Sequence, residues 1–354
     1  MNIIDLGWGQ YTEEFPQYKK QNKETVARVA AENKTNYVLF SNFGELEGLV
    51  RGSFLNNATE NSEFPKVGDW VEIQKLQGED KAVIKSILPR KTTISRAAAL
   101  KKTQQVIATN VDIIFIIQAL DSNFNLRRLE RYVVTAKESG CQAVIILNKT
   151  DLEDSGKKAE EVRKALPGLL VFSLSAKTGA GMQVIEYLLE PGKTVVFMGS
   201  SGVGKTTLIN YLTGASNLKA GELGQGGKGK HTTTRRELVL LPDGAILIDT
   251  PGMRELGLWV SDEAVDESFL DIQELSKKCE FGNCDHIKSS GCAVLKALSE
   301  GVLGQARYES YLKLFSEADV IRPKTKETPK EMMKRKSKYK KMQKNYNRDL
   351  WKEY

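Results

Sequence analysis

Residues 199–206 read Gly-Ser-Ser-Gly-Val-Gly-Lys-Thr and lie between an apolar run at 194–198 and a helix-like stretch at 207–212. Glycines let the backbone curl so that successive N–H groups point at phosphate oxygens, and the start of a helix adds positive charge there. Lys205 brings a cation to the β- and γ-phosphates, and Thr206 offers a hydroxyl to Mg²⁺. The pattern predicts a phosphate-binding loop made of Gly199, Ser200, Ser201, Gly202, Val203, Gly204, Lys205, Thr206 and Thr207.

The apolar runs around this loop predict an α/β domain. Helix-like stretches separate them, and the runs lie at 111–117, 143–147, 169–172, 194–198 and 245–249. The runs are nearly continuous, as expected of strands buried on both faces of a parallel sheet. A βαβ series of this kind indicates a doubly wound sheet.

A second motif, Asp249-Thr250-Pro251-Gly252, ends the last apolar run. A carboxylate at a strand end near a phosphate-binding loop typically binds Mg²⁺, usually through water, and the Gly252 N–H can sense the γ-phosphate. We therefore expect Thr206 and Asp249 to organise Mg²⁺.

A third motif, Asn148-Lys149-Thr150-Asp151, predicts which base is bound. The Asp151 carboxylate can accept both the N1–H and the exocyclic amino group of guanine, which adenine does not offer in that arrangement. Asn148 would hold the loop and reach the guanine edge, and the Lys149 stem would cover a base face. One strand later, Ser175-Ala176-Lys177 would supply the Ala176 N–H to guanine O6. Such a motif is weak alone, but these neighbours make GTP and GDP the expected ligands.

The order of these motifs is unusual, because the guanine motifs precede the phosphate-binding loop in the chain. The same site can form because the motifs meet in space, so we predict a circularly permuted GTPase domain. The segment after residue 252 then leads directly into the C-terminal part. We hypothesise that nucleotide-driven movement of this segment is passed on to the cysteine-containing part, which would act as a switch.

The N-terminal part predicts a small β-barrel. Five short runs with turn residues between them lie at 25–30, 37–40, 46–52, 69–73 and 82–87. Their spacing fits a five-stranded OB-type barrel, although SH3-like barrels have similar patterns. Residues 1–22 are polar without a clear pattern, and residues 89–110 are basic and loop-like.

A cluster of metal-binding residue types lies near the C-terminal end, within helical patterns. Three thiolates and one imidazole form a closed tetrahedral set, which suits one structural Zn²⁺ and leaves no open position for catalysis. One of the two histidines of the chain belongs to this set, which is Cys279, Cys284, His286 and Cys292. Zinc removal is expected to unfold residues 260–320 while the phosphate-binding domain survives.

Charge is concentrated in the tail. Residues 322–354 hold 13 basic and 4 acidic groups, a formal charge of +9, which leaves −2 on the rest of the chain. Tyr339, Tyr346 and Trp351 lie among the lysines, where aromatic rings can stack on unpaired bases. A solvated tail that aids solubility is the alternative.

Other features of the composition set the cellular context. No membrane-length apolar run and no signal-peptide pattern is present, so a cytoplasmic protein without a membrane partner is expected. Four cysteines are too few for a disulfide framework in 354 residues, and Cys141 suits a small buried hydrophobe.

Taken together, the motif order, the barrel and the Cys/His cluster resemble the bacterial ribosome small-subunit-dependent GTPase A (RsgA) family over residues 24–320. The resemblance implies an OB-fold, a permuted GTPase domain and a zinc-binding domain. It also implies a role late in small ribosomal subunit assembly and stimulation by the subunit. The expected divisions are a barrel at 1–90, a GTPase domain at 91–257, a helical zinc-binding domain at 258–320 and a basic tail at 321–354.

The Gly-rich segment 226–234 is the expected switch. One of its threonines should meet Mg²⁺ and the γ-phosphate; we favour Thr233, with little to separate it from Thr232. Met253 stands where many GTPases place a glutamine that orients the attacking water, and a thioether cannot do that. His231 is the nearby substitute, and the resemblance supports it; a solvent-exposed loop histidine or a contact to RNA phosphate is the alternative. The expected catalytic residues are His231, Lys205 and Thr233.

Three hypotheses about function follow. The first is a monomeric GTPase that binds the small ribosomal subunit and its rRNA and hydrolyses GTP when engaged. The second is a nucleotide-gated RNA-binding module in which hydrolysis is incidental. The third is a permuted GTPase that serves the large subunit; the barrel and the zinc cluster count against it because of the architecture that the resemblance implies.

Overall fold

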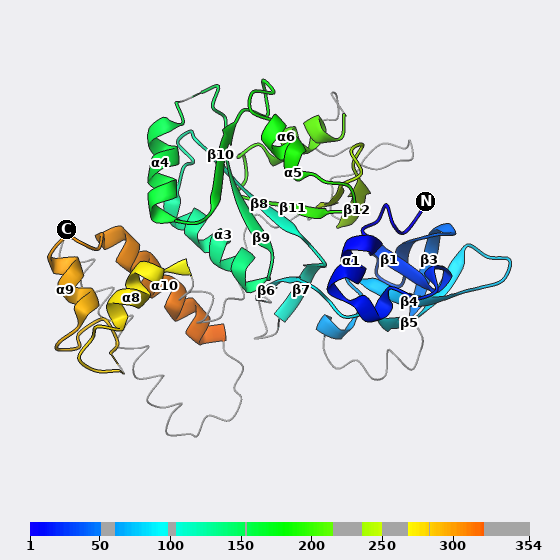
Figure 1. Ribbon diagram of the computed structural model, residues 1–354, viewed down its shortest axis with the longest axis horizontal. Helices are drawn as coiled ribbons and strands as arrows, with labels where there is room; N and C mark the ends of the chain where they lie inside the picture. Colours follow the sequence, from blue (N-terminus) through cyan, green and yellow to red (C-terminus); the bar gives the residue numbers. More distant parts are fainter. Residues whose placement is uncertain are drawn as a thin grey trace. The chain divides into compact units, whose positions relative to one another are not determined.

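Figure 1 shows the computed structural model of the protein. Contacts divide the chain into two compact units, Met1–Trp259 and Val260–Tyr354. The structure describes residues 1–50, 61–97, 104–152, 154–214, 236–249, 268–282 and 284–321. Among these, no helix is both long and apolar enough to cross a membrane.

A five-stranded barrel forms the N-terminal part of the first unit. Its strands are β1 (Val26–Glu32), β2 (Tyr37–Ser41), β3 (Gly44–Val50), β4 (Trp70–Lys75) and β5 (Lys81–Ile87). They follow the order β1-β2-β3-β5-β4, and β4 pairs back with β1, which closes the sheet. The interior holds apolar side chains from alternate strand positions: Ala27, Val29, Tyr37, Leu39, Leu46, Val71, Ile73, Ala82 and Ile84. The OB-type prediction is confirmed.

The first 18 residues pack onto this barrel, although their sequence pattern was unclear. They contain helix α1 (Trp8–Glu14) and a short 3-10 turn, Pro16–Tyr18; two further 3-10 turns are Lys23–Thr25 and Asn61–Glu63. The Trp8 ring meets the Trp70 ring edge-on at 4.8 Å between centroids. A small apolar cluster results, made of Ile3, Leu6, Trp8, Tyr11, Val26, Trp70 and Leu88.

The second part of this unit is the α/β domain. Its sheet order is β10-β9-β8-β11-β13-β12. These strands are β8 (Ile113–Ala119), β9 (Gln142–Asn148), β10 (Leu170–Leu174), β11 (Thr194–Met198), β12 (Glu237–Leu240) and β13 (Ile246–Asp249). Pairing is parallel except between β12 and β13, and the short β12 was not predicted.

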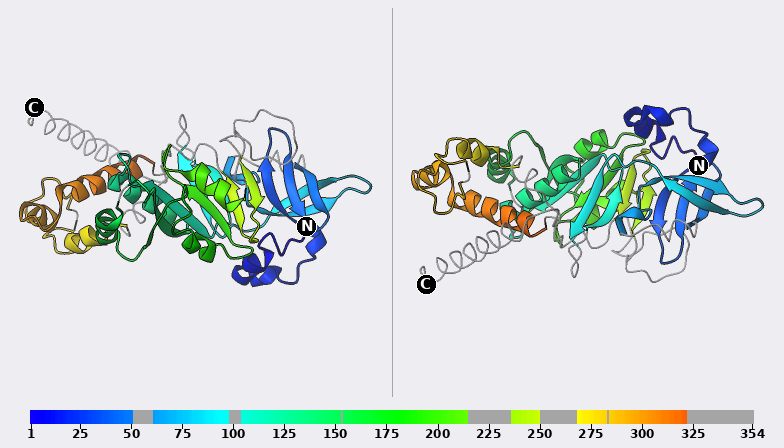
Figure 2. Two further views of the ribbon diagram at one scale, coloured as in Figure 1. Left: turned by 90° about the horizontal axis from the view of Figure 1, so that it is seen from above. Right: turned by 90° about the horizontal axis from the view of Figure 1, so that it is seen from below.

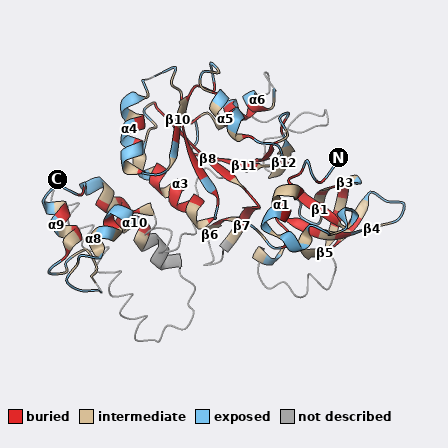
Figure 3. Cartoon of the chain, viewed as in Figure 1, coloured by how far each residue is buried: buried red, intermediate tan, exposed pale blue. Residues whose placement is uncertain are grey.

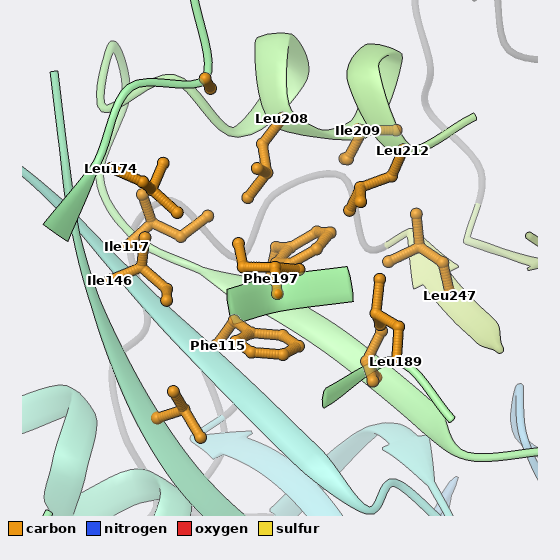
Figure 4. Close-up of a cluster of buried hydrophobic side chains, with 14 of the residues drawn as sticks. Phe115, Ile117, Ile146, Leu174, Leu189, Phe197, Leu208, Ile209, Leu212 and Leu247 are labelled. Carbon is orange, nitrogen blue, oxygen red and sulfur yellow. The ribbon is translucent and has the colours of Figure 1, made fainter. Parts of the chain in front are cut away.

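Helices cover both faces of this sheet. They are α3 (Leu126–Glu138), α4 (Gly156–Ala165), α5 (Gln183–Leu188) and α6 (Lys205–Leu212). In Figure 4, side chains of α6 point toward Phe197 of the sheet, whose ring lies 5.5 Å from that of Phe115. Helix α3 contacts β8 and β9, and Ile114 alternates with Phe115 along β8, so α3 packs on the other face. Figure 3 shows the buried residues along these strands and on α3.

A hairpin joins the barrel to the α/β domain, and here the loop-like prediction for residues 89–110 was wrong. Strand β6 (Thr93–Ala97) pairs antiparallel with β7 (Gln104–Thr109). Ile94 is buried on β6, and Val106, Ile107 and Ala108 are buried on β7, so the apolar residues of this hairpin pack inward. The lysines and arginines of the segment gave it a loop-like appearance in the sequence.

A buried arginine joins the barrel to the α/β sheet. Strand β1 pairs with β12 at Ala31 and Glu237, so the two sheets are continuous (Figure 2). Arg28 on β1 is only 1% exposed. Its guanidinium donates to the carbonyl oxygens of Leu6 (2.5 Å), Gly68 (3.3 Å) and Asn110 (3.2 Å) and to Thr194 Oγ1 (2.8 Å). Burial lowers its pKa to about 10, so the side chain is charged at neutral pH.

The described part of the second unit is helical. It contains α8 (Leu270–Ser276), α9 (Ala293–Ser299) and α10 (Gln305–Ile321). Phe269 is fully buried; the Arg307 guanidinium lies 4.1 Å from its ring centroid, and Tyr311 meets it edge-on. The predicted fold class, with a helical C-terminal part around a Cys/His cluster, is confirmed. The basic tail lies outside the described residues.

Candidate functional site

The predicted phosphate-binding loop connects β11 to α6, and two of its glycines are required by close contacts. A Cβ on Gly199 would lie 2.4 Å from the Ile117 carbonyl oxygen. A Cβ on Gly204 would lie 2.2 Å from the Asn148 amide nitrogen, and the φ angle there is 100°. Only glycine fits these positions without displacement of the neighbouring loop.

Lys205 is held at the mouth of this loop. Its ammonium donates to the carbonyl oxygens of Gly199 and Ser200, both at 2.6 Å. These bonds fix a positive charge beside the helix start, where phosphate oxygens would arrive.

Asn148 joins three loops at the carboxyl end of the sheet. It ends β9, is 2% exposed, and donates through its amide nitrogen to the Val203 carbonyl oxygen at 2.8 Å. Its amide oxygen accepts the Ala176 N–H at 3.0 Å. The N–H predicted to meet guanine O6 therefore already has a partner within the protein.

Asp151 and Lys149 present charged groups beside Asn148. Asp151 accepts a hydrogen bond from the Ser175 hydroxyl at 2.6 Å, which holds the pKa of this exposed carboxyl below its ordinary value. Asp151 is therefore ionised at neutral pH, as an acceptor of two guanine N–H groups must be. Lys149 has φ 72°, in the left-handed region, and its ammonium lies 2.7 Å from an Asp121 carboxylate oxygen.

The predicted magnesium-binding residues lie at the same edge of the sheet. Asp249 is the last residue of β13, which runs parallel to β11 and beside it. The carboxyl ends of parallel neighbours share one edge, so Asp249 and Thr206 lie beside the phosphate-binding loop. Thr207 and Lys177 are exposed at this edge. His231, Thr233 and Gly252 lie outside the described residues.

The structure brings the four C-terminal cluster residues together. Their ligand atoms all lie within 4.8 Å of one another, in the set Cys279, Cys284, His286 and Cys292. The Cys279 and Cys292 sulfurs are 3.9 Å apart, close to the roughly 3.8 Å expected between two thiolates bound tetrahedrally at about 2.3 Å from Zn²⁺. His286 Nδ1 lies 3.7 Å from the first sulfur and 3.5 Å from the second.

Neighbouring residues support this cluster. The Tyr308 hydroxyl donates to the His286 carbonyl oxygen at 2.5 Å, and the Leu295 N–H donates to Cys292 Sγ at 3.4 Å. No disulfide joins any of the four cysteines. The donor set and its spacing fit a structural zinc ion.

Two residues of this site were missed in the sequence. Asp121 and Asn123 lie in the loop after β8 and contact the guanine loop and the phosphate-binding loop, respectively. Their sequence signal is a pair of polar residues just beyond a buried strand, which is too common to single out.

The fold and these loops define a P-loop GTPase whose guanine-binding loop precedes its phosphate-binding loop, that is, a circularly permuted GTPase. Residues 87–259 match the family described as RsgA GTPase. A protein of Opitutus terrae named small ribosomal subunit biogenesis GTPase RsgA is 42% identical over 328 residues, 89% of each chain. A protein of the same name from Leptospira interrogans is 38% identical and covers 87% of this chain.

Solved structures agree with this relationship. The crystal structure of YjeQ from Thermotoga maritima superposes with a TM-score of 0.61 at 26% identity, over 83% of this chain and 98% of that one. YloQ, described as a circularly permuted GTPase, has the same fold with a TM-score of 0.59 at 24% identity, over 87% of this chain and 99% of that one. The chain belongs to the RsgA GTPase family and is a GTP-hydrolysing enzyme that uses guanine nucleotide with Mg²⁺.

Proposed function

We propose that this GTPase binds the small ribosomal subunit through its rRNA and hydrolyses GTP late in assembly of the subunit, as a monomer in the cytoplasm. The observation that carries the proposal is the 42% identity to a relative named for small-subunit biogenesis, over 89% of both chains. That span includes most of the barrel and the C-terminal cluster as well as the GTPase domain. The basic tail would add salt-dependent attraction to rRNA phosphates.

The proposed roles of the phosphate- and Mg²⁺-binding residues rest on their motifs and, for Lys205, on its contacts. The N–H groups of the phosphate-binding loop and the Lys205 ammonium hold the β- and γ-phosphates. Thr206 and Asp249 hold Mg²⁺, which when bound neutralises charge on the phosphates. Lys205 retains its place beside the Gly199 and Ser200 carbonyls and directs its charge to the γ-phosphate, where negative charge develops during attack by water.

Guanine selection rests on the Asp151 carboxylate. One of its oxygens is held by Ser175, so the carboxylate has a fixed direction before the base arrives. Lys149 covers one face of the base, and guanine O6 shares the Ala176 N–H with Asn148. Lys177 flanks the base pocket. An adenine in this place would leave the carboxylate without a donor.

The proposed roles of His231 and Thr233 rest on the sequence. Thr233 meets Mg²⁺ and the γ-phosphate, and His231 helps to place the attacking water because Met253 cannot. Free turnover should therefore be slow, and contact with rRNA would raise it. In the second unit, Zn²⁺ has a structural role in holding the helices around the cluster.

Replacement Asp151→Asn tests the guanine assignment. An amide places an NH2 donor group where one of the two carboxylate oxygens accepted, so it suits the 2-oxo group of xanthine better than the 2-amino group of guanine. We expect GTP affinity to fall roughly a hundredfold and xanthosine triphosphate to become the better ligand. Asp154→Asn is the matched control, because Asp154 is exposed and contacts the Gly156 N–H within its own loop. Unchanged preference for GTP in Asp151→Asn would remove Asp151 from the base pocket.

A further inference from the structure

The loop after β8 lies between the two nucleotide loops because of its place in the sheet. Strand β8 has β9 on one side and β11 on the other. Parallel strands end at one edge, so the segment 120–123 has the guanine loop on one flank and the phosphate-binding loop on the other. The Leu120 N–H donates to the Asn148 carbonyl oxygen at 3.0 Å, and this backbone hydrogen bond connects segment 120–123 to the guanine loop.

Asn123 contacts the phosphate-binding loop directly. Its amide nitrogen donates to the Ser201 carbonyl oxygen at 3.1 Å. In a trans peptide the C=O and the following N–H point in opposite directions. A bond that holds the Ser201 oxygen toward Asn123 therefore turns the Gly202 N–H away from Asn123. Asn148 holds the Val203 carbonyl in the same manner.

The orientation of the Asn123 amide is itself fixed. Arg128 Nη2, which can only donate, lies 2.7 Å from the Asn123 amide oxygen, so the amide nitrogen must face the phosphate-binding loop. The backbone is held as well, because Gln118 donates to the Asn123 carbonyl at 2.8 Å and Asp121 accepts its N–H at 2.9 Å. The side chain is preorganised rather than free to rotate.

Asp121 links this arrangement to the base-covering lysine. One carboxylate oxygen accepts the Asn123 N–H, and the other lies 2.7 Å from the Lys149 ammonium. Each side chain is 27% exposed, so the pair is partly shielded from water. The hydrogen bond from Lys149 lowers the pKa of Asp121, which keeps the carboxylate ionised. Lys149 adopts a left-handed backbone that is costly for a lysine, and this ion pair favours that conformation.

We propose that segment 120–123 is a nucleotide-positioning loop, in which Asn123 orients the backbone that binds the β-phosphate and Asp121 holds Lys149 over the base. The inference rests on the proposed place of the nucleotide. Neither residue contacts reacting atoms, so both are positioning residues. The two act on different parts of the ligand, and this difference supplies the test.

The test compares GDP with GMP, which lacks the β-phosphate. Affinities of the full-length protein are measured by displacement of a fluorescent GDP. Asn123→Ala should lower the affinity for GDP about tenfold, which is equivalent to one lost hydrogen bond of roughly 1.4 kcal/mol. It should lower the affinity for GMP less than about twofold. Asp121→Ala should weaken GDP and GMP by one common factor of about three to ten, and Asp121→Asn should recover part of that loss because its amide oxygen still accepts from Lys149.

Asn125→Ala is the matched control. Asn125 caps α3 by accepting the Arg128 N–H at 2.9 Å, so its loss should lower the melting temperature without changing the GDP-to-GMP ratio. The proposal would be overturned if Asn123→Ala lowered the affinities for GDP and GMP equally, or lowered neither. A changed GDP-to-GMP affinity ratio in Asn125→Ala would also overturn it. If the wild-type protein binds GDP no better than ADP, the proposed guanine site fails instead.

Discussion

Replacement Arg28→Met removes the guanidinium that joins the N-terminal segment, the barrel and the α/β sheet, and keeps a long apolar stem. Two of its acceptors, the Leu6 and Asn110 carbonyl oxygens, lie in residues that are 0% and 6% exposed. The Gly68 carbonyl keeps a hydrogen bond from the Asn110 amide at 3.0 Å. The substitution therefore leaves the buried carbonyl oxygens of Leu6 and Asn110 without their arginine donor.

The magnitude follows from these two groups. A buried acceptor that has lost its donor lowers the free energy of unfolding by about 1–3 kcal/mol, so two such acceptors lower it by roughly 2–6 kcal/mol. Loss of the desolvation penalty of a buried charge offsets part of this, and we expect a net loss of about 3 kcal/mol. In a domain of this size the melting temperature should fall by roughly 6–12 °C.

Thermal and urea unfolding of the full chain, followed by tryptophan fluorescence, would measure the effect, because Trp70 lies beside Arg28 and Trp8 packs against Trp70. Lys85→Met, an exposed change on β5, is the control and should be nearly neutral. A loss below about 1 kcal/mol for Arg28→Met would refute the reasoning, since the carbonyls would then be satisfied without the arginine.

Three further outcomes are expected. Chelation of zinc should melt the helices of the second unit, seen as a partial loss of helical circular dichroism, and leave GDP binding intact; parallel loss of GDP binding would contradict this. Gly204→Ala should abolish GDP binding because the new Cβ would lie 2.2 Å from the Asn148 amide nitrogen, whereas Gly9→Ala, with open space around it, should bind normally. Burial raises the pKa of Cys141 to about 12, so at pH 8 it should react with iodoacetamide on the order of a thousandfold more slowly than a free thiol; labelling by mass spectrometry at the rate of the urea-unfolded protein would count against this.

Much of the fold follows from local pattern. The five barrel runs and the five α/β runs correspond to strands in the structure. Alternation of apolar and polar residues indicates a strand buried on one face, and a continuous apolar run indicates a strand buried on both faces. The N-terminal segment lacks such a period. Its apolar residues are scattered, and they are buried because they pack against barrel residues such as Trp70 that are distant in sequence. Arg28 likewise lies within a strand as an ordinary charged residue, yet four separate segments of the chain supply its acceptors.

The same distinction applies to the site. Asn148, Asp151, Lys205 and the Cys/His cluster belong to motifs whose spacing alone indicates chemistry. Asp121 and Asn123 belong to no such motif. Their positions matter because β8 lies between β9 and β11, and this order becomes visible only in the assembled sheet.

The most direct measurement of the proposed function is GTP hydrolysis by the purified protein alone, with small ribosomal subunits and with large subunits, with ATP as the control nucleotide. Slow hydrolysis alone, strong stimulation by small subunits only, and no hydrolysis of ATP is the predicted result. Stimulation by large subunits instead, or by neither, would contradict the proposed partner while the guanine-specific enzyme remained.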